Sequence, residues 1–547
     1  MNSNKFALNL NRVFCGIFAF NFILLFIWII FFGYEKEINS NTYNCIPDEH
    51  FQIALTAIIM TIALSLIYYF WNTRFRSDRV RALLVDNDLN TRRTLIIGVL
   101  VMLLIQLVVA YFLQCKPVTD LEIIRKHAMS FAETGRYELM EKELNAGYAY
   151  FYRYPNNWAI LFFWSYIFRA SYLLTGGVNP YMPVVINTIA INVSVLLAVL
   201  LAQKIYGNKK AIFTFLICFL FMPYYTYTPF YYTDSLSMPL VMGGIYILYN
   251  AVNSDTKYKK YVLMAVSGVV LLLGFKFKAS VIFIVIAAVI YMFLSCSFKR
   301  FAALSLALLV GFGSSAVMYK GVTSLTGVYN EELSEKYEFP SIHWVMMGLQ
   351  GLGYYHPYDS DFTAGFPDRE SKKQGDMIRL EKRINMLNNP NPGEDSMLDH
   401  IFKKAVWTWE DGSYYASHHI SEPLYERNWL HDLVIIGGKN YYGYYCFVCG
   451  IQLFLIFCMI RSAIKSLIRP KIDFTILFKG VIFGAFIFFI IWETRARYLF
   501  NFTPLFILLA CDGLDLTFEG DFKRLDERDY GEKKKITHKK RKKKKRA

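Results

Sequence analysis

The sequence predicts an all-α polytopic membrane protein with about 12 transmembrane helices. Of its 547 residues, 55% are hydrophobic and 17% are aromatic, and the mean hydropathy is positive. Several windows of about 18 to 20 residues carry no charged side chain, which is the length that an α-helix needs to cross a bilayer. Composition and segment length together favour a membrane protein over a soluble one.

Polar interruptions divide the apolar stretches into twelve expected spans. They cover residues 13–33, 52–71, 95–114, 181–203, 211–229, 236–252, 261–275, 279–296, 301–319, 442–461, 475–492 and 497–512. The first stretch is long and no small-residue cleavage site follows it, so we interpret it as a retained anchor rather than a signal peptide.

Basic connections predict the orientation of these spans. Six connections and ends are rich in Lys and Arg, and alternating the spans places all six in the cytoplasm, as the positive-inside rule requires. We therefore expect a multi-pass plasma-membrane protein with both termini cytoplasmic. The net charge of +16 comes mostly from the end of the chain, where residues 533–546 hold eleven Lys and Arg. Such a tail is expected to lie on anionic lipid, and no nucleic-acid partner is expected.

One apolar segment does not fit the span count. Residues 157–174 are flanked by Pro155 and the Gly176–Gly177 pair and contain Arg169. Making them a span would move the basic turn "QKIYGNKK" to the outside. We therefore predict an amphipathic helix lying in the outer membrane interface.

The spans and loops predict five segments. They are a two-span extension (1–94), a transmembrane core with a catalytic outer loop at 115–180 (95–319), an extracytoplasmic insert (320–441), C-terminal spans (442–514) and a basic cytoplasmic tail (515–547). The insert contains several Trp and His residues and is expected to fold as a cap. Any chemistry should lie on this outer face, because the long loops are there.

Two aspartates mark the expected outer edge of the membrane. Asp120 follows the third span and begins a stretch with helical spacing of apolar residues, and Asp234 lies in "YTPFYYTDSLSMPL" between two spans. A carboxylate held beside lipid is partly desolvated, so Asp120 suits a general base for a hydroxyl nucleophile. The alternative for both aspartates is a helix N-cap.

Basic residues gather at the same expected edge. Glu493, Arg495 and Arg497 lie in "IIWETRARYLFNFTP", where charges need partners or a ligand, and arginine forks suit phosphate oxygens. The alternative is a helical Glu493–Arg497 pair. Lys276 and Lys278 also emerge here, with snorkelling as their alternative.

Four cations and two aspartates on one rim indicate an anionic lipid ligand and a base, and a polyprenyl-phosphate sugar fits both. In such a reaction, the phosphate is the leaving group and basic residues stabilise it, while an aspartate takes the proton of the acceptor hydroxyl.

The order of five motifs resembles the GT-C membrane glycosyltransferases. "PVTDLEIIRKHAMSF", "YRYPNNWAILFF", "QKIYGNKKA", "PFYYTDSLSMPL" and "ETRARYLFNFTPLFILLA" follow one another over about residues 95–512 and look like bacterial, family 39-like members similar to the dolichyl-phosphate-mannose-protein mannosyltransferases. The resemblance implies a GT-C-like core with interfacial helices in the first large outer loop. It further implies that Asp120 is the base, that Asp234 belongs to the site, and that Arg495 and Arg497 meet the donor phosphate.

Two blocks of the insert, "SIHWVMMGLQGLGYYHPYD" and "KKAVWTWEDGSYYAS", look like outer loops of Gram-positive members. His343 and Asp411 in these blocks, together with Glu493, are the acceptor-side candidates. Core packing is the alternative for His343 and Asp411.

Residues 1–94 depart from the pattern, because they precede the usual start of the family's core. Their loop carries Asp48 and Glu49, either of which is an alternative to Asp120 as the acid of the first loop. Cys45 and Cys115 both lie beside spans on the expected outer side, where a disulfide and two free thiols are the alternatives.

We therefore expect an inverting hexosyltransferase that moves a monosaccharide from a polyprenyl phosphate to a cell-envelope polysaccharide, glycolipid or protein. The chain has no glycine-rich phosphate loop, and the outer carboxylates permit a divalent cation although no ligand spacing requires one. A lipid-linked saccharide polymerase or ligase is the main alternative. A flippase or other transporter would predict repeated halves and charges at mid-bilayer, which the sequence lacks.

Overall fold

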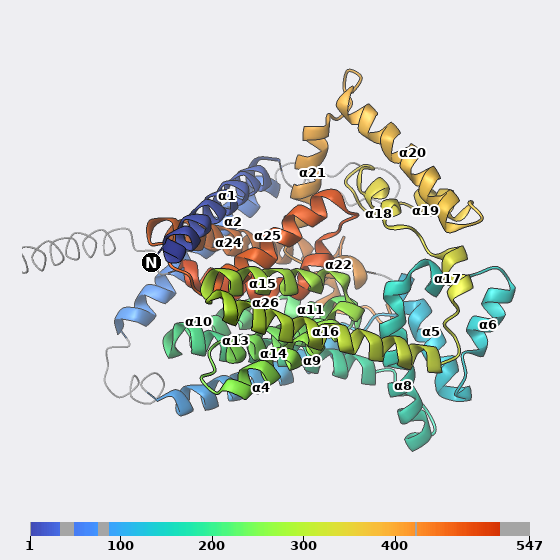
Figure 1. Ribbon diagram of the computed structural model, residues 1–547, viewed down its shortest axis with the longest axis horizontal. Coiled ribbons are helices and arrows are strands. Elements are labelled where there is room, and N and C mark those ends of the chain that lie inside the picture. Colours follow the sequence, from blue (N-terminus) through green and yellow to red (C-terminus); the bar gives the residue numbers. More distant parts are fainter. Residues whose placement is uncertain (1, 33–48, 75–86, 422–423, 515–547) are drawn as a thin grey trace, which may run out of the picture.

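The computed structural model describes residues 2–32, 49–74, 87–421 and 424–514 (Figure 1). Within these ranges, the regular structure is helical apart from an isolated bridge between Cys115 and Leu424. The predicted all-α polytopic fold is confirmed.

Every predicted span contains a helix. The twelve helices are α1 (Asn2–Phe32), α2 (Glu49–Arg74), α4 (Asp88–Phe112), α9 (Met182–Tyr206), α10 (Asn208–Leu220), α13 (Met238–Val252), α14 (Lys257–Phe277), α15 (Ile282–Ser295), α16 (Phe298–Leu325), α24 (Tyr441–Ile468), α25 (Thr475–Ile491) and α26 (Thr503–Gly513). Of the described helices, eight are long and apolar enough to cross a membrane. Five of the twelve, α10, α13, α15, α25 and α26, have fewer than 18 residues, and α13 reaches crossing length only together with the turn before it, over residues 233–252. Every residue of α26 is buried.

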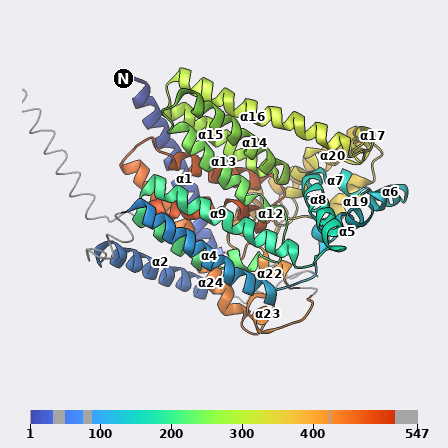
Figure 2. The ribbon, with the colours of Figure 1, turned by 90° about the horizontal axis from the view of Figure 1, so that it is seen from below.

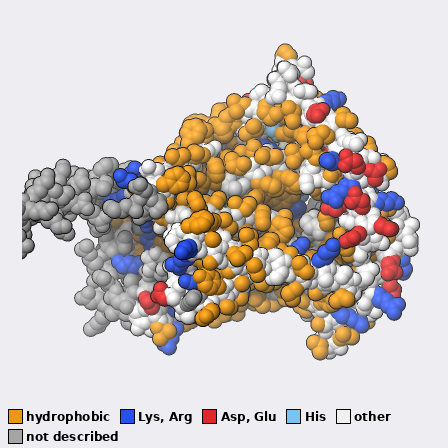
Figure 3. Space-filling model, viewed as in Figure 1, with side chains coloured by type: hydrophobic (Ala, Val, Ile, Leu, Met, Phe, Trp, Pro, Cys, Tyr) orange, Lys and Arg blue, Asp and Glu red, His pale blue; other side chains and the backbone are white. Residues whose placement is uncertain are grey.

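The helices form one bundle with a polar end. Figures 1 and 2 show the spans side by side, with helices α5–α8 and α17–α20 at one end of them. In Figure 3, hydrophobic side chains cover the bundle, while acidic and basic side chains gather where those helices lie. We call this region the polar end. It matches the predicted asymmetry, and the side of the membrane that it faces stays a prediction.

Helices from the loop after α4 build one half of the polar end. They are α5 (Thr119–Thr134), α6 (Glu138–Asn145), α7 (Tyr150–Arg153), η1 (Pro155–Asn157) and α8 (Trp158–Thr175). Helix α8 packs against α5, and Gly176 ends it in a left-handed conformation (φ 75°). Arg169, the charge within this apolar helix, donates to the carbonyls of Ala132 and Glu133 at the end of α5. Residues 157–174 are thus a separate helix, as predicted, and their position in the membrane interface stays a prediction.

The insert builds the other half of the polar end. It contains α17 (Glu331–Tyr337), α18 (Ser341–Gly348), α19 (Pro357–Ala364), α20 (Arg369–Asn388), α21 (Met397–Trp409), α22 (Ala416–His419) and α23 (Trp429–Val434). A buried pair joins α19 to α20, since the Arg383 guanidinium donates to both oxygens of Asp359 at 2.8 and 3.0 Å. Bidentate pairing satisfies a carboxylate that burial would otherwise penalise.

Helices α1 and α2 pack along α24 rather than standing apart from the bundle. The Phe22 ring meets the Trp409 ring edge-on at 5.3 Å, and Asn11 donates to the carbonyl of Lys471 at 3.0 Å. The predicted N-terminal extension is therefore part of the same packed body as the C-terminal spans.

The contact between α14 and α16 depends on small residues. A Cβ atom added at Gly311 would lie 2.0 Å from the Ala265 carbonyl oxygen, whereas one added at Gly313 meets nothing within 4 Å. We expect Gly311→Ala to cost roughly 1–3 kcal/mol, because the helices must separate to admit the methyl group. Thermal unfolding in detergent checks this, with Gly313→Ala as the matched control. Equal unfolding midpoints for the two variants would contradict it.

Candidate functional site

Asp120 is the second residue of α5, and its carboxylate faces two tyrosines rather than the helix backbone. Val118 is the N-cap residue and its side chain makes no capping bond, and Thr119 turns the chain with φ 51°. The Tyr150 hydroxyl donates to Asp120 Oδ1 at 2.5 Å, and the Tyr232 hydroxyl lies 3.1 Å from Oδ2. The N-cap alternative for Asp120 is therefore wrong.

Asn157 holds both tyrosines in place. This buried amide donates to the Tyr150 hydroxyl at 2.8 Å, and its oxygen accepts from the Tyr232 hydroxyl at 2.8 Å. The Asp120 side chain remains 34% exposed. It is thus partly desolvated, held in one orientation and open to an incoming group.

Arg497 reaches the same carboxylate from the other end of the chain. It lies in η3 (Ala496–Phe502), and its Nη2 is 3.9 Å from Asp120 Oδ2. Its guanidinium lies over the rings of Tyr232 and Tyr498, at 5.5 and 5.2 Å from their centroids. We use the name aspartate cluster for five residues: Asp120, Tyr150, Asn157, Tyr232 and Arg497.

Asp234 is fully buried beside this cluster and is ion-paired with Lys278. It lies in α12 (Thr233–Leu236), whose N-cap residue is Tyr232, so the N-cap alternative for Asp234 is also wrong. The Lys278 ammonium additionally lies 4.7 Å from the centroid of Tyr498. Lys278 therefore does not snorkel, and its charge is neutralised by Asp234.

Lys276 points elsewhere. Its ammonium lies 4.8 Å from the ring centroid of Tyr319, on α16. No contact joins Lys276 to the aspartate cluster within the described part of the chain. The structure thus separates the two lysines that the sequence placed together.

Glu493 and the two arginines do not form a helix. Residues 493–495 run without regular structure between α25 and η3, so the helical Glu493–Arg497 pair does not form. The Tyr498 hydroxyl donates to Glu493 Oε2 at 2.7 Å instead. Arg495 donates to the Tyr415 hydroxyl at 2.6 Å. The two arginines therefore have different partners: Arg495 contacts Tyr415, and Arg497 lies near Asp120.

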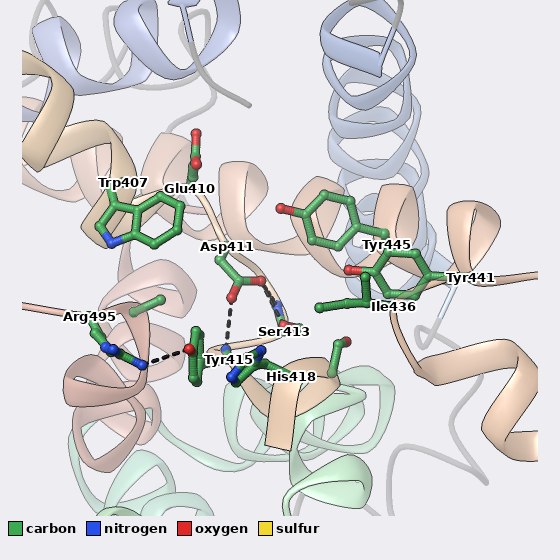
Figure 4. Close-up of a pocket in the computed structure, with 12 residues that line it drawn as sticks. Trp407, Glu410, Asp411, Ser413, Tyr415, His418, Ile436, Tyr441, Tyr445 and Arg495 are labelled. Atoms are coloured by element: carbon green, nitrogen blue, oxygen red, sulfur yellow. Dashed lines mark hydrogen bonds between the residues drawn. The ribbon is translucent and has the colours of Figure 1, made fainter. Parts of the chain in front are cut away.

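Arg495 lines an open pocket on its side of the segment (Figure 4). The cavity itself measures about 30 Å³, and the empty space reaches about 450 Å³ when the part open to solvent is counted. Its lining residues are Trp407, Glu410, Asp411, Ser413, Tyr415, Ser417, His418, Ile436, Tyr441, Tyr445, Arg495 and Ala496. We call it the aromatic pocket.

Asp411 lines this pocket and holds its floor. Its carboxylate accepts from the Ser413 backbone and hydroxyl at 2.9 and 2.7 Å, and from the Tyr415 backbone at 2.8 Å. The structure thereby places two acceptor-side candidates, Asp411 and Glu493, near the arginines.

The third acceptor-side candidate, His343, is elsewhere. It is fully buried in the insert, with Nδ1 2.7 Å from the Thr363 hydroxyl, which donates to Asp376 at 2.6 Å. Burial lowers the pKa of His343 to about 3. The packing alternative therefore describes His343.

The insert is hydrogen-bonded to the segment that carries both arginines. The sequence carries no clear signal for this contact. The Glu493 and Thr494 amides donate to the carbonyls of Trp344 and Gly353, at 3.1 and 2.7 Å. The hydroxyls of Thr494 and Thr408 lie 3.1 Å apart. These bonds fix the backbone of the segment, so the insert positions the arginines.

Sequence reasoning also missed Tyr150, Asn157 and Tyr232. Two of them stand in quoted motifs, since Asn157 belongs to "YRYPNNWAILFF" and Tyr232 to "PFYYTDSLSMPL". A polar amide next to a long aromatic run is a signal that could have found Asn157, because a buried amide needs partners.

Several predictions fall outside the described residues. Asp48, Cys45 and the basic tail 515–547 lie there, as does the side chain of Glu49, so the alternative acid and the Cys45–Cys115 disulfide stay predictions. Within the described ranges, no group of three or more His, Cys, Asp or Glu side chains could hold a metal ion.

Comparison with known proteins gives a family. A family model described as "conserved hypothetical integral membrane protein" matches residues 7–517. The chain belongs to this family. No curated protein and no solved structure matched the chain. The family description agrees with a multi-pass membrane protein and names no reaction, so glycosyl transfer stays a prediction.

The buried Asp234–Lys278 pair should be essential to the fold of the polar end. Asp234→Asn leaves an ammonium without its counter-charge in a buried site, which costs about 3–5 kcal/mol. Glu331→Gln is the control, because it breaks the Lys320–Glu331 pair, whose side chains are both 76% exposed, and no measurable loss is expected. Thermal unfolding in detergent compares them, and equal loss would contradict the assignment.

Lys404 should make the stability of the insert depend on pH. Its ammonium nitrogen donates to the Gly348 carbonyl at 2.6 Å, and burial lowers its pKa from 10.5 to about 7, with Glu493 opposing. Between these values, the unfolded chain binds a proton that the folded chain lacks, so the free energy of unfolding rises with pH. From pH 7 to pH 9, the rise should be about 2 kcal/mol.

Thermal unfolding at the two pH values checks this expectation. Lys404→Met should remove the rise, whereas Lys403→Met should keep it, because Lys403 is 53% exposed. A rise of equal size in the Lys404→Met protein would assign the pH dependence to other groups.

Proposed function

We propose that this protein is a membrane glycosyltransferase of the GT-C class. It transfers a monosaccharide from a polyprenyl-phosphate donor to a hydroxyl of a cell-envelope polysaccharide, glycolipid or protein, on the outer side of the plasma membrane. The observation that carries the proposal is the meeting of the Asp120 carboxylate with the Arg497 guanidinium at the polar end of the bundle. A base and a phosphate-binding cation thereby lie side by side.

Asp120 is the general base in this proposal. Tyr150 and Tyr232 orient its carboxylate, and its exposed third leaves room for an acceptor hydroxyl. The acceptor oxygen attacks C1 of the sugar, its proton passes to Asp120, and the bond between C1 and the phosphate oxygen breaks. The polyprenyl phosphate leaves with the bonding electrons, and a single displacement of this kind inverts C1.

Arg497 stabilises the leaving phosphate. Its contact with Asp120 is long at 3.9 Å, and its buried Nε has no protein partner among the described residues. A guanidinium with an unused N–H suits phosphate oxygens, and the negative charge that develops on the phosphate strengthens the interaction in the transition state. Lys278 and Asp234 form a neutral buried pair behind it, so Arg497 is the main cation that faces the base.

The basic tail lies on the anionic cytoplasmic leaflet, and both termini are cytoplasmic. The polymerase or ligase alternative uses the same cluster with a diphosphate-linked oligosaccharide, and donor identity separates the two.

Replacement of the base, Asp120, should strongly slow sugar transfer. We expect Asp120→Asn to lower the rate of sugar transfer roughly 10²–10⁴-fold, because a neutral amide cannot accept the hydroxyl proton. The measurement uses purified protein, radiolabelled polyprenyl-phosphate sugars and bacterial membranes as acceptor. Glu122→Gln is the matched control, since it removes an exposed carboxylate from the same turn of α5. Native rates in the Asp120→Asn protein would exclude Asp120 as the base.

A further inference from the structure

The aromatic pocket has the chemistry of a sugar site rather than of a phosphate site. Four of its lining residues carry aromatic six-membered rings, namely Trp407, Tyr415, Tyr441 and Tyr445. Its charged side chains are two carboxylates and one guanidinium, so they do not favour a second anion. Rings that present apolar faces, beside oxygens that accept hydrogen bonds, suit a ligand with apolar C–H faces and a rim of hydroxyls.

The walls of the pocket come from separate parts of the chain. In Figure 4, Trp407 lies on one side of Asp411, and Tyr441 and Tyr445 lie on the other with their hydroxyl ends toward it. Trp407 belongs to α21, and the two tyrosines belong to the first turn and a half of α24. Aromatic rings thus stand on two sides of the Asp411 carboxylate, at the open mouth of the pocket.

The floor of the pocket is held in an unusual backbone conformation. Tyr414 and Tyr415 have φ values of 53° and 70°, which residues other than glycine rarely adopt. Asp411 fixes this turn through the bonds to Ser413 and Tyr415 described above. As a result, the Tyr415 hydroxyl receives the Arg495 hydrogen bond at 2.6 Å. Arg495 is therefore held against the pocket and turned away from Asp120.

The pocket lies next to the segment that carries Arg497 of the aspartate cluster. Ala496 lines the pocket and stands between Arg495 and Arg497. His419, the neighbour of the lining residue His418, stacks on Phe230 at 3.6 Å, and burial, together with the charges of Arg497 and Arg495, holds the pKa of His419 well below its usual value. A ligand in the pocket would thus lie against the same short segment as the phosphate-binding arginine.

We infer that the aromatic pocket binds a hexopyranose ring, stacked on Trp407 and hydrogen-bonded by Asp411 and Arg495. The inference rests on the proposed function for the source of the sugar, which is either the donor's monosaccharide or the saccharide of the acceptor. It refines the role predicted for Arg495, which binds sugar hydroxyls instead of the donor phosphate.

Direct binding tests the inference without requiring transfer. Methyl hexopyranosides of the gluco, galacto, manno and N-acetylglucosamine series are titrated into the full-length protein in detergent, and binding is followed by saturation-transfer NMR. We expect at least one glycoside to bind the native protein, and Trp407→Leu to weaken that binding about tenfold through loss of the stacked ring. Trp429→Leu is the matched control, because Trp429 is 69% exposed and lies outside the pocket.

Each outcome decides the inference. No saturation transfer to any glycoside, or equal binding by the native and Trp407→Leu proteins, overturns it. Tyr441→Leu, on the opposite wall, replaces Trp407→Leu if that variant does not fold. If the native protein binds a glycoside but transfers no sugar from any polyprenyl-phosphate donor, the proposed function is refuted and the pocket assignment stands.

Competition identifies the source of the sugar. A short-chain polyprenyl-phosphate hexose that displaces the bound glycoside, when the same polyprenyl phosphate without sugar does not, assigns the pocket to the donor. Simultaneous binding of the glycoside and the sugar-bearing donor assigns it to the acceptor.

Discussion

The cost of burying charge beside a helical bundle controls the architecture of the polar end. An unpaired ion in such a site costs several kcal/mol, so each charge must meet an opposite charge or a polar group. Asp234 meets Lys278, Arg497 meets Asp120, Arg495 meets Tyr415 and Glu493 meets Tyr498. Three of these four pairs join segments that lie far apart in the chain. They tie the turn before α13 to the end of α14, and the α25–η3 connection to the loop after α4 and to the insert.

Tyrosine is the residue that makes this arrangement possible. A phenol hydroxyl satisfies a carboxylate without adding a second charge, and the face of the ring attracts a cation. Tyr232 does both, since its hydroxyl meets Asp120 and its ring lies under Arg497. Tyr498 does the same for Glu493 and Lys278. The carboxylate of Asp120 thereby keeps its orientation while part of it stays open, which a direct, short ion pair would prevent.

The insert fixes the segment that carries Arg495 and Arg497, and their side chains contact different groups. Backbone bonds from Trp344 and Gly353 hold the segment before η3, so the side chains of Arg495 and Arg497 leave it in different directions. Arg497 serves the aspartate cluster, and Arg495 serves the aromatic pocket. Only Ala496 separates the two arginines, so this fixed segment also sets the distance between the aromatic pocket and the aspartate cluster.

The sequence by itself determined the membrane class, the helices and the candidate charges. These follow from apolar length and from the rarity of charge near hydrocarbon, which are local properties of the chain. Residues 157–174 could be set apart as their own helix for the same reason, because Arg169 and the basic turns constrain the count. Asp120 and Arg497 were both candidates from the sequence, since each stands next to an apolar run.

Only the tertiary structure decided which charges meet. The pairing of Lys278 with Asp234, the separation of Lys276, and the divergence of Arg495 from Arg497 depend on side-chain directions across segments distant in sequence. The burial of His343 and the partial exposure of Asp120 depend on packing by the insert and by α7. Periodicity and composition report the surroundings of one segment, whereas partners in a buried site are chosen by the fold of all of them.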